Sequence, residues 1–194
     1  NAGIIVLLIV FQPEIRRFLL KLGKAGLGDR ENLWDLIRGN KKQRTKQHEQ
    51  AAAEIIKALE YFSSTKTGAL MVFFSTFKLN DFNSPGVKIN GVISAKLLES
   101  IFEKSSPLHD GAVIVSQSRI VFAGTVLPVS ESPSVPERAG LRHRAAIGIT
   151  EETDALSVIV SEETGTISYA RNGKIKPIAS INELQLVLHK ALVG

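Results

Sequence analysis

The sequence predicts a single α/β domain whose central mixed β-sheet is flanked by helices, preceded by an N-terminal helical segment that leaves a membrane and serves as a linker. Its 194 residues, 44% of them hydrophobic, are enough for one core of ordinary size. From Gly68 onward, short β-rich runs alternate with turns and helical stripes. That alternation is typical of a mixed sheet and not of a helix bundle.

The N-terminal segment, residues 1–30, is predicted to be the end of a transmembrane helix followed by a juxtamembrane helix. Residues 2–11 form an unbroken apolar run, about half of the roughly 20 residues that span a bilayer, and the chain begins at Asn1. We expect the run to be the end of a longer membrane helix; the alternative is a buried core helix. Four basic residues follow it, namely Arg16, Arg17, Lys21 and Lys24. This placement favours the cytoplasmic flank of a bacterial cell membrane, with the domain in the cytoplasm.

Residues 31–67 are predicted to be a linker and a packing helix. The stretch Arg38–Gln50 is polar and rich in basic residues, as in a solvated linker or an exposed helix. Helical spacing of apolar residues returns further along, at Ala53, Ile56, Leu59 and Phe62. We therefore expect a helix that packs onto the domain formed by residues 68–194.

The predicted strands of this domain are short apolar runs bounded by glycine, proline and polar turns. They cover residues 68–74, 87–93, 112–115, 120–127, 156–160 and 166–170. The runs 112–115 and 120–127 are expected to form one hairpin, and the last two runs a second hairpin. Ser94 is a good N-cap for a helix through Phe102, another helix starts near Glu137 or Arg142, and residues 182–192 form a closing helix.

Composition and charge narrow the function only partly. The chain has no cysteine, which excludes disulfides and thiolate metal sites and permits a reducing compartment. Its net charge of +5 favours an anionic partner, whether lipid head groups, nucleotide or nucleic acid.

Three polar clusters interrupt the apolar pattern and are the candidates for chemistry. They are residues 108–112 (LHDGA), 142–144 (RHR) and 161–164 (SEET). Taken singly, each is explained better by a turn, a solvated helix start or a hairpin tip than by a functional site. Together they supply guanidinium groups for phosphate oxygens and carboxylates for a divalent metal or a reacting hydroxyl, as a nucleotide polyphosphate requires.

These clusters, in this order, resemble the DAC domain of diadenylate cyclases, in particular the membrane-bound CdaA class. The matching motifs are DGA at 110–112, LP at 127–128 with SESP at 130–133, GLRHRAA at 140–146 and VSEETG at 160–165. The resemblance covers about residues 68–174, and the stretch 11–17 (FQPEIRR) is similar to the family's exit from its last membrane helix.

The resemblance implies an enzyme that joins two ATP molecules into cyclic di-AMP and releases two pyrophosphates. Each subunit of a homodimer holds one ATP, and each ribose 3'-hydroxyl attacks the α-phosphate bound by the partner. By this resemblance, Asp110 orients or deprotonates the 3'-hydroxyl. Gly111 lets the backbone approach the nucleotide closely, and the small Ala112 is compatible with that.

The resemblance also implies the remaining ligands of ATP and of a metal. Arg142 and Arg144 are expected to neutralise the triphosphate, and His143 to donate a hydrogen bond to the same oxygens. Ser161 is expected to contact phosphate, and main-chain groups near Leu127 to hold the adenine. The expected metal ligands, for Mn²⁺ or Mg²⁺, are Glu163, Asp110 and His109.

Two positions depart from the family pattern, and both concern nucleotide contacts. Leu141 stands where a threonine is usual, and Val126 where a tyrosine is often found. They put one hydroxyl contact and one stacking contact in doubt. The partners implied by the resemblance are a YbbR-type membrane protein and phosphoglucosamine mutase, with no nucleic acid.

Two other functions compete with the cyclase. A nucleotide-binding sensor that lacks the reaction would be favoured by loss of Asp110 or of either arginine, and all three are present. A basic adaptor for lipid or nucleic acid would use residues 16–44 and would bind less tightly as salt rises, but it leaves the three clusters unexplained.

Overall fold

The computed structural model describes residues 30–74, 86–132 and 140–193, and of residues 30–44 and 193 it describes the backbone alone. The chain divides into two units, Asn1–Thr45 and Lys46–Gly194. The predicted membrane end and juxtamembrane helix lie outside the described residues. Within the described ranges, no helix combines the length and the apolar character that crossing a membrane requires.

Seven strands in the described part of the chain form one mixed sheet in the order β2-β4-β3-β1-β5-β6-β7. Their bounds are β1 Ala69–Phe74, β2 Val87–Val92, β3 Ala112–Ser116, β4 Arg119–Thr125, β5 Leu156–Val160, β6 Ile167–Arg171 and β7 Lys174–Pro177. Only the central pair of these strands, β1 and β3, is parallel, with Met71 opposite Val113. The two predicted hairpins are confirmed as β3–β4 and β5–β6.

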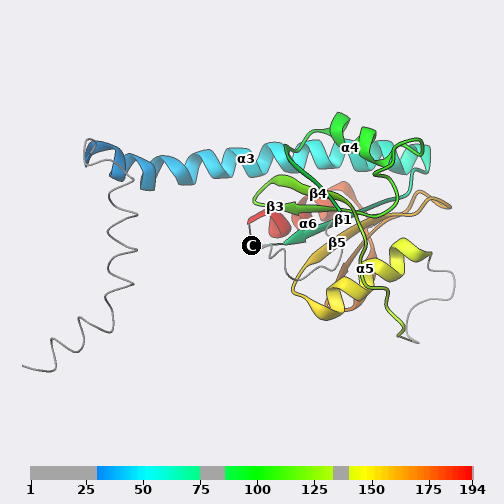
Figure 1. Ribbon diagram of the computed structural model, residues 1–194. Coiled ribbons are helices and arrows are strands. Elements are labelled where there is room, and N and C mark those ends of the chain that lie inside the picture. Colours follow the sequence, from blue (N-terminus) through cyan, green and yellow to red (C-terminus); the bar gives the residue numbers. More distant parts are fainter. Residues whose placement is uncertain (1–29, 75–85, 133–139, 194) are drawn as a thin grey trace, which may run out of the picture. The chain divides into compact units, whose positions relative to one another are not determined.

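Helices cover both faces of this sheet, and Figure 1 shows α4 and α5 on opposite sides of it. The described helices are α3 Arg30–Thr65, α4 Ala95–Phe102, α5 Leu141–Glu152 and α6 Ile181–Val193. The alternation of β1 divides the core: Met71 and Phe73 pack with α4, α6 and the part of α3 from Ala51, whereas Leu70 and Val72 pack with α5. Strand β1 is therefore buried on both faces. Its pairing with β3 and β5 fixes where those two strands begin and end.

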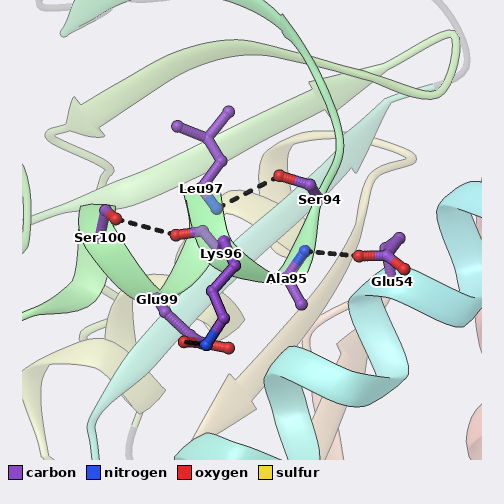
Figure 2. A network of polar contacts seen from close by, with 7 residues as sticks. All are labelled: Glu54, Ser94, Ala95, Lys96, Leu97, Glu99 and Ser100. Atoms are coloured by element: carbon purple, nitrogen blue, oxygen red, sulfur yellow. Dashed lines mark hydrogen bonds and ion pairs between the residues drawn. The ribbon is translucent and has the colours of Figure 1, made fainter.

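Helix α4 is held at its start by its own cap and by α3. The Ser94 side chain accepts a hydrogen bond from the Leu97 amide at 3.3 Å, which confirms the predicted cap. The carboxylate of Glu54, on α3, accepts from the Ala95 amide at 2.9 Å, as Figure 2 shows. These two acceptors satisfy backbone amides that a helix start would otherwise leave without partners.

Two sequence predictions about local structure need correction. The packing helix exists, but Ala53 is exposed and Ile56 only partly buried, while Ala51, Ile55 and Ala58 are buried. The sheet also has a strand, β7, that is absent from the predicted strands.

Candidate active site

A pocket of about 300 Å³ brings the three polar clusters together at one place on the domain. Three segments border it: the loop before β3, the first turn of α5 and the end of β5 with its following turn. Its lining residues are Asp110, Gly140, Leu141, Arg142, His143, Val160, Ser161, Glu162 and Glu163. The parallel pairing of β1 with β3 and its antiparallel pairing with β5 set these segments side by side.

Asp110 is exposed in the pocket, and its position depends on the glycine that follows it. Gly111 has a φ angle of +141°, a conformation that side chains rarely adopt. A Cβ at Gly111 would lie 2.6 Å from the Gly124 carbonyl carbon, on the backbone of β4. The backbone of the chain itself therefore requires a glycine at this position. This requirement adds to the close approach of nucleotide that the family resemblance implies.

Among the described residues, the first turn of α5 presents an uncapped helix N-terminus to the pocket. Gly140 occupies the N-cap position and supplies no side-chain hydrogen bond. Backbone amides at such a terminus, together with the helix dipole, favour a bound anion. Further along α5, a Cβ at Gly148 would lie 2.4 Å from the Pro128 carbonyl oxygen, so this helix packs directly on the loop after β4.

Arg142 lines the pocket, but its guanidinium is already engaged by the protein. Nη1 donates to Oε2 of Glu162 at 2.9 Å, and Nη2 donates to the main-chain oxygen of His109 at 3.1 Å. Its Nε is buried and finds no hydrogen-bond partner among the described residues. Arg142 thus links all three segments of the site.

The turn after β5 is fixed by backbone and side-chain hydrogen bonds. The Ser161 carbonyl accepts from the Gly165 amide at 2.8 Å, and the Ser161 hydroxyl accepts from the Thr164 amide at 3.3 Å. Ser63, near the end of α3, donates its hydroxyl to the Gly165 carbonyl at 2.7 Å. These contacts set the position from which Ser161, Glu162 and Glu163 reach the pocket.

His143 is partly buried in the pocket wall. Burial lowers the pKa of its imidazole below the ordinary value of 6.5, because the charged form loses solvation, and the Glu163 carboxylate acts in the opposite direction. This shift favours the neutral ring, in which one nitrogen donates and the other accepts a hydrogen bond.

The carboxylates of Asp110 and Glu163 are the residues of this pocket that fit a divalent metal. Both are exposed and border the same space, and hard oxygen ligands suit Mg²⁺ and Mn²⁺. Two protein carboxylates are a common complement for a metal that also binds substrate phosphates. The described residues contain no group of three or more His, Asp or Glu that would form a metal site from protein alone.

The pocket gathers half of the residues that the sequence analysis proposed for the site: Asp110, Arg142, His143, Ser161 and Glu163. The other half lie outside its lining. Ala112 and Leu127 are buried in the core against α5. The Nδ1 of His109 lies 2.6 Å from the Ser106 carbonyl, and Arg144 is partly buried, with its main-chain oxygen accepting from Ser130.

Three residues of the site were missed or given no role by sequence reasoning. Glu162 was read only as part of a polar cluster, although its place next to Ser161 and Glu163 was a usable signal. The sequence pattern predicts Gly68 only as the start of a strand, yet a Cβ there would lie 2.8 Å from Nη1 of Arg142. Leu141 was noted as a departure, and it lines the pocket with 77% of its surface exposed.

Comparison with known proteins adds three kinds of similarity. Residues 56–175 match the family model described as DAC, the DisA bacterial checkpoint controller nucleotide-binding domain. The chain is 38% identical to the diadenylate cyclase of Listeria monocytogenes over 191 residues, which cover 98% of this chain and 67% of that protein. It is 40% identical to the cyclic di-AMP synthase CdaA of Bacillus subtilis over 173 residues, 89% of this chain and 60% of that protein.

A solved structure agrees with these relatives. The crystal structure of DacA from Staphylococcus aureus superposes with a TM-score of 0.73 at 39% identity, over 77% of this chain and 99% of that one. This chain spans between three fifths and two thirds of the length of the two full relatives. The matched family model covers more than half of the chain and all three polar clusters, and the chain therefore belongs to the DAC family of diadenylate cyclases.

Proposed function

We propose that this chain condenses two ATP molecules into cyclic di-AMP and two pyrophosphates, within a face-to-face dimer. The observation that carries this proposal is the meeting of Asp110, the uncapped start of α5 and the Ser161–Glu163 turn in one pocket. A carboxylate for a hydroxyl proton thus adjoins a place suited to phosphate. Membership of the family supplies the substrate class.

In the proposed reaction, the 3'-oxygen of one ATP forms a bond to the α-phosphorus of the other. The bond from that phosphorus to the bridging oxygen breaks, and pyrophosphate leaves with the electron pair. Asp110 accepts the hydroxyl proton or orients the hydroxyl for attack. The same exchange in the opposite direction closes the ring and releases the second pyrophosphate.

Groups at the start of α5 bind and orient the triphosphate. Backbone amides of the first turn donate to phosphate oxygens, and the His143 ring donates one further hydrogen bond. Ser161 contacts phosphate from the opposite wall. Arg144 adds positive charge from the same helix, and main-chain groups near Leu127 hold the adenine.

A divalent metal, Mn²⁺ or Mg²⁺, would be held by Asp110 and Glu163 together with the substrate phosphates. When bound, it supplies charge neutralisation on the phosphates and polarises the attacked phosphorus. His109 is the weakest of the three proposed ligands, since its side chain is outside the pocket lining and Nδ1 lies against Ser106.

Two ATP molecules must react with each other, and by the family resemblance each subunit binds one of them. We therefore propose a two-fold homodimer as the active species, with the pockets facing each other. Exposed apolar side chains support a buried face on this part of the domain: Leu141 lines the pocket, and Val126 and Val129 lie on the loop after β4 that packs on α5.

The domain is proposed to lie in the bacterial cytoplasm, attached to the cell membrane through residues 1–30. The apolar run followed by basic residues supports this attachment. A YbbR-type membrane protein and phosphoglucosamine mutase are proposed partners, on the family resemblance alone.

The experiment that tests this proposal measures product stoichiometry and its dependence on chain concentration. The chain is incubated with ATP and Mn²⁺ or Mg²⁺, and cyclic di-AMP and pyrophosphate are quantified across a dilution series. We expect two pyrophosphates per cyclic di-AMP, and a rate per chain that rises with concentration until dimers are saturated. ATP binding without product would instead identify a nucleotide sensor.

A further inference from the structure

We propose that Glu162 is a positioning residue for this reaction: through Arg142 it holds the His109 carbonyl, and with it the neighbouring Asp110. This inference rests on the proposed function. No sequence motif assigns Glu162 a role of its own, and its carboxylate acts on another residue and not on the substrate.

The chain of contacts runs from the turn after β5 to the loop before β3. Glu162 accepts a hydrogen bond from Nη1 of Arg142 at 2.9 Å. The opposite end of the same planar guanidinium donates from Nη2 to the His109 carbonyl at 3.1 Å. Because a guanidinium is rigid, fixing one end of it restricts the other.

Space for this arrangement is provided by Gly68, at the start of β1. A Cβ at that position would lie 2.8 Å from Nη1 of Arg142 and 2.9 Å from Oε2 of Glu162. The φ angle of Gly68 lies outside the left-handed region, so backbone conformation does not require a glycine there. The close approach of the Arg142–Glu162 ion pair is what requires a glycine at this position.

Burial of Arg142 shows that the protein itself sets the direction of this side chain. Its side chain is 23% exposed, and its Nε is buried with no partner among the described residues. Each terminal nitrogen donates one of its N–H groups to the protein, which fixes the direction of the guanidinium. One of these nitrogens binds the residue before Asp110.

Two other roles for Glu162 make different predictions. The carboxylate is 61% exposed, and an exposed ion pair that does nothing further contributes little to stability. Alternatively, Glu162 competes with ATP phosphates for Arg142, in which case its removal would tighten ATP binding.

The kinetic test compares Glu162→Ala and Glu162→Gln with the parent. The glutamine keeps one acceptor for Nη1, so its effect should be smaller than that of the alanine. We expect kcat to fall about tenfold in Glu162→Ala, since small misplacements of a reacting group lower rates strongly. The KM for ATP should stay within about threefold of the parent, because binding groups are untouched. Glu152→Ala, at an exposed glutamate ending α5, is the matched control.

A second measurement needs no turnover. Hydrogen–deuterium exchange of residues 105–111 reports whether the loop carrying Asp110 is held. We expect faster exchange in Glu162→Ala than in the parent, and unchanged exchange in Glu152→Ala. Gly68→Ala, which pushes the ion pair apart without altering any charge, should show the same faster exchange.

The outcomes separate this inference from the proposed function. Unchanged kcat and unchanged exchange in Glu162→Ala would overturn the positioning role, and so would a lowered KM for ATP, which would make Glu162 a competitor of phosphate. A parent that makes no cyclic di-AMP would overturn the proposed function. In that case the exchange measurement still decides whether Glu162 holds the loop.

Discussion

The backbones of Gly111 and Gly124 are in close contact: a Cβ on Gly111 would lie 2.6 Å from the Gly124 carbonyl carbon and 2.9 Å from its Cα. The contact seats the residue after Asp110 directly on β4. Both glycines have positive φ angles, +141° and +66°. The position of the candidate catalytic carboxylate thus depends on two glycines, Gly111 just before β3 and Gly124 on the paired strand β4.

Gly111→Ala is expected to destabilise the domain and to displace Asp110. The substitution combines an unfavourable φ angle with a backbone clash, and we expect it to lower the free energy of unfolding by about 2 kcal/mol or more. Urea denaturation measures this loss. Gly140→Ala is the control, because within the described part of the chain the nearest atom to a Cβ there is His143 Nδ1 at 4.0 Å, and its change should stay below about 1 kcal/mol. Equal losses in the two variants would contradict the account.

Ser63→Ala is expected to loosen the turn that carries Glu163. It removes the donor to the Gly165 carbonyl and should lower the free energy of unfolding by about 1 kcal/mol. Ser64→Ala is the matched control, since the exposed Ser64 hydroxyl bonds only to Tyr61 within its own helix. Thermal denaturation compares the two. If Ser64→Ala lowered the free energy of unfolding as much as Ser63→Ala does, the hydrogen bond from Ser63 to Gly165 would contribute nothing specific to stability.

The partly buried His143 predicts how stability depends on pH. Its pKa is lowered in the folded protein, so as pH falls below the ordinary value of 6.5 the unfolded state takes up a proton first. Stability is therefore lost as pH falls through 6.5 toward the folded pKa and levels off below it. We expect His143→Gln to show a smaller loss between about pH 7.5 and pH 5.5, measured by denaturant unfolding at each pH. An identical loss in parent and variant would remove His143 as a source of this dependence.

Glu163→Gln tests the proposed metal carboxylates. Loss of one anionic oxygen ligand should raise the Mn²⁺ or Mg²⁺ concentration needed for half-maximal rate, by about tenfold. The measurement is a metal titration at saturating ATP. Glu152→Gln, far along α5 from its first turn, should titrate as the parent does. An unshifted midpoint in Glu163→Gln would exclude this carboxylate from the metal site.

Much of the fold could be predicted because local signals agree with the final packing. Ser94 caps a helix in the way its sequence position indicates, and the two hairpins pair as expected. The predicted buried face of α3 was wrong for a geometrical reason. A strict spacing of three residues, as from Ala53 to Ile56, drifts by about 60° per step around a helix. The buried face alternates threes and fours and so passes through Ile55.

The site was predicted only in part because its remaining members act through contacts between distant segments. Asp110, His143 and Glu163 stand out as polar residues among apolar ones. Glu162 and Gly68 have meaning only once Arg142 is placed between them, and no local pattern shows that. The hydrogen bond from Arg142 to the His109 carbonyl could not be predicted from the sequence either.

The most direct test of the central claim is the product that the chain makes from ATP, with and without the Asp110 carboxylate. Parent and Asp110→Asn chains, both shown to be folded and dimeric, are incubated with ATP and Mn²⁺ or Mg²⁺, and cyclic di-AMP is measured by mass spectrometry. The account predicts product from the parent and at least a hundredfold less from Asp110→Asn, on the order of the loss of a general base. No product from the folded parent with either metal, or equal product from both chains, would contradict it.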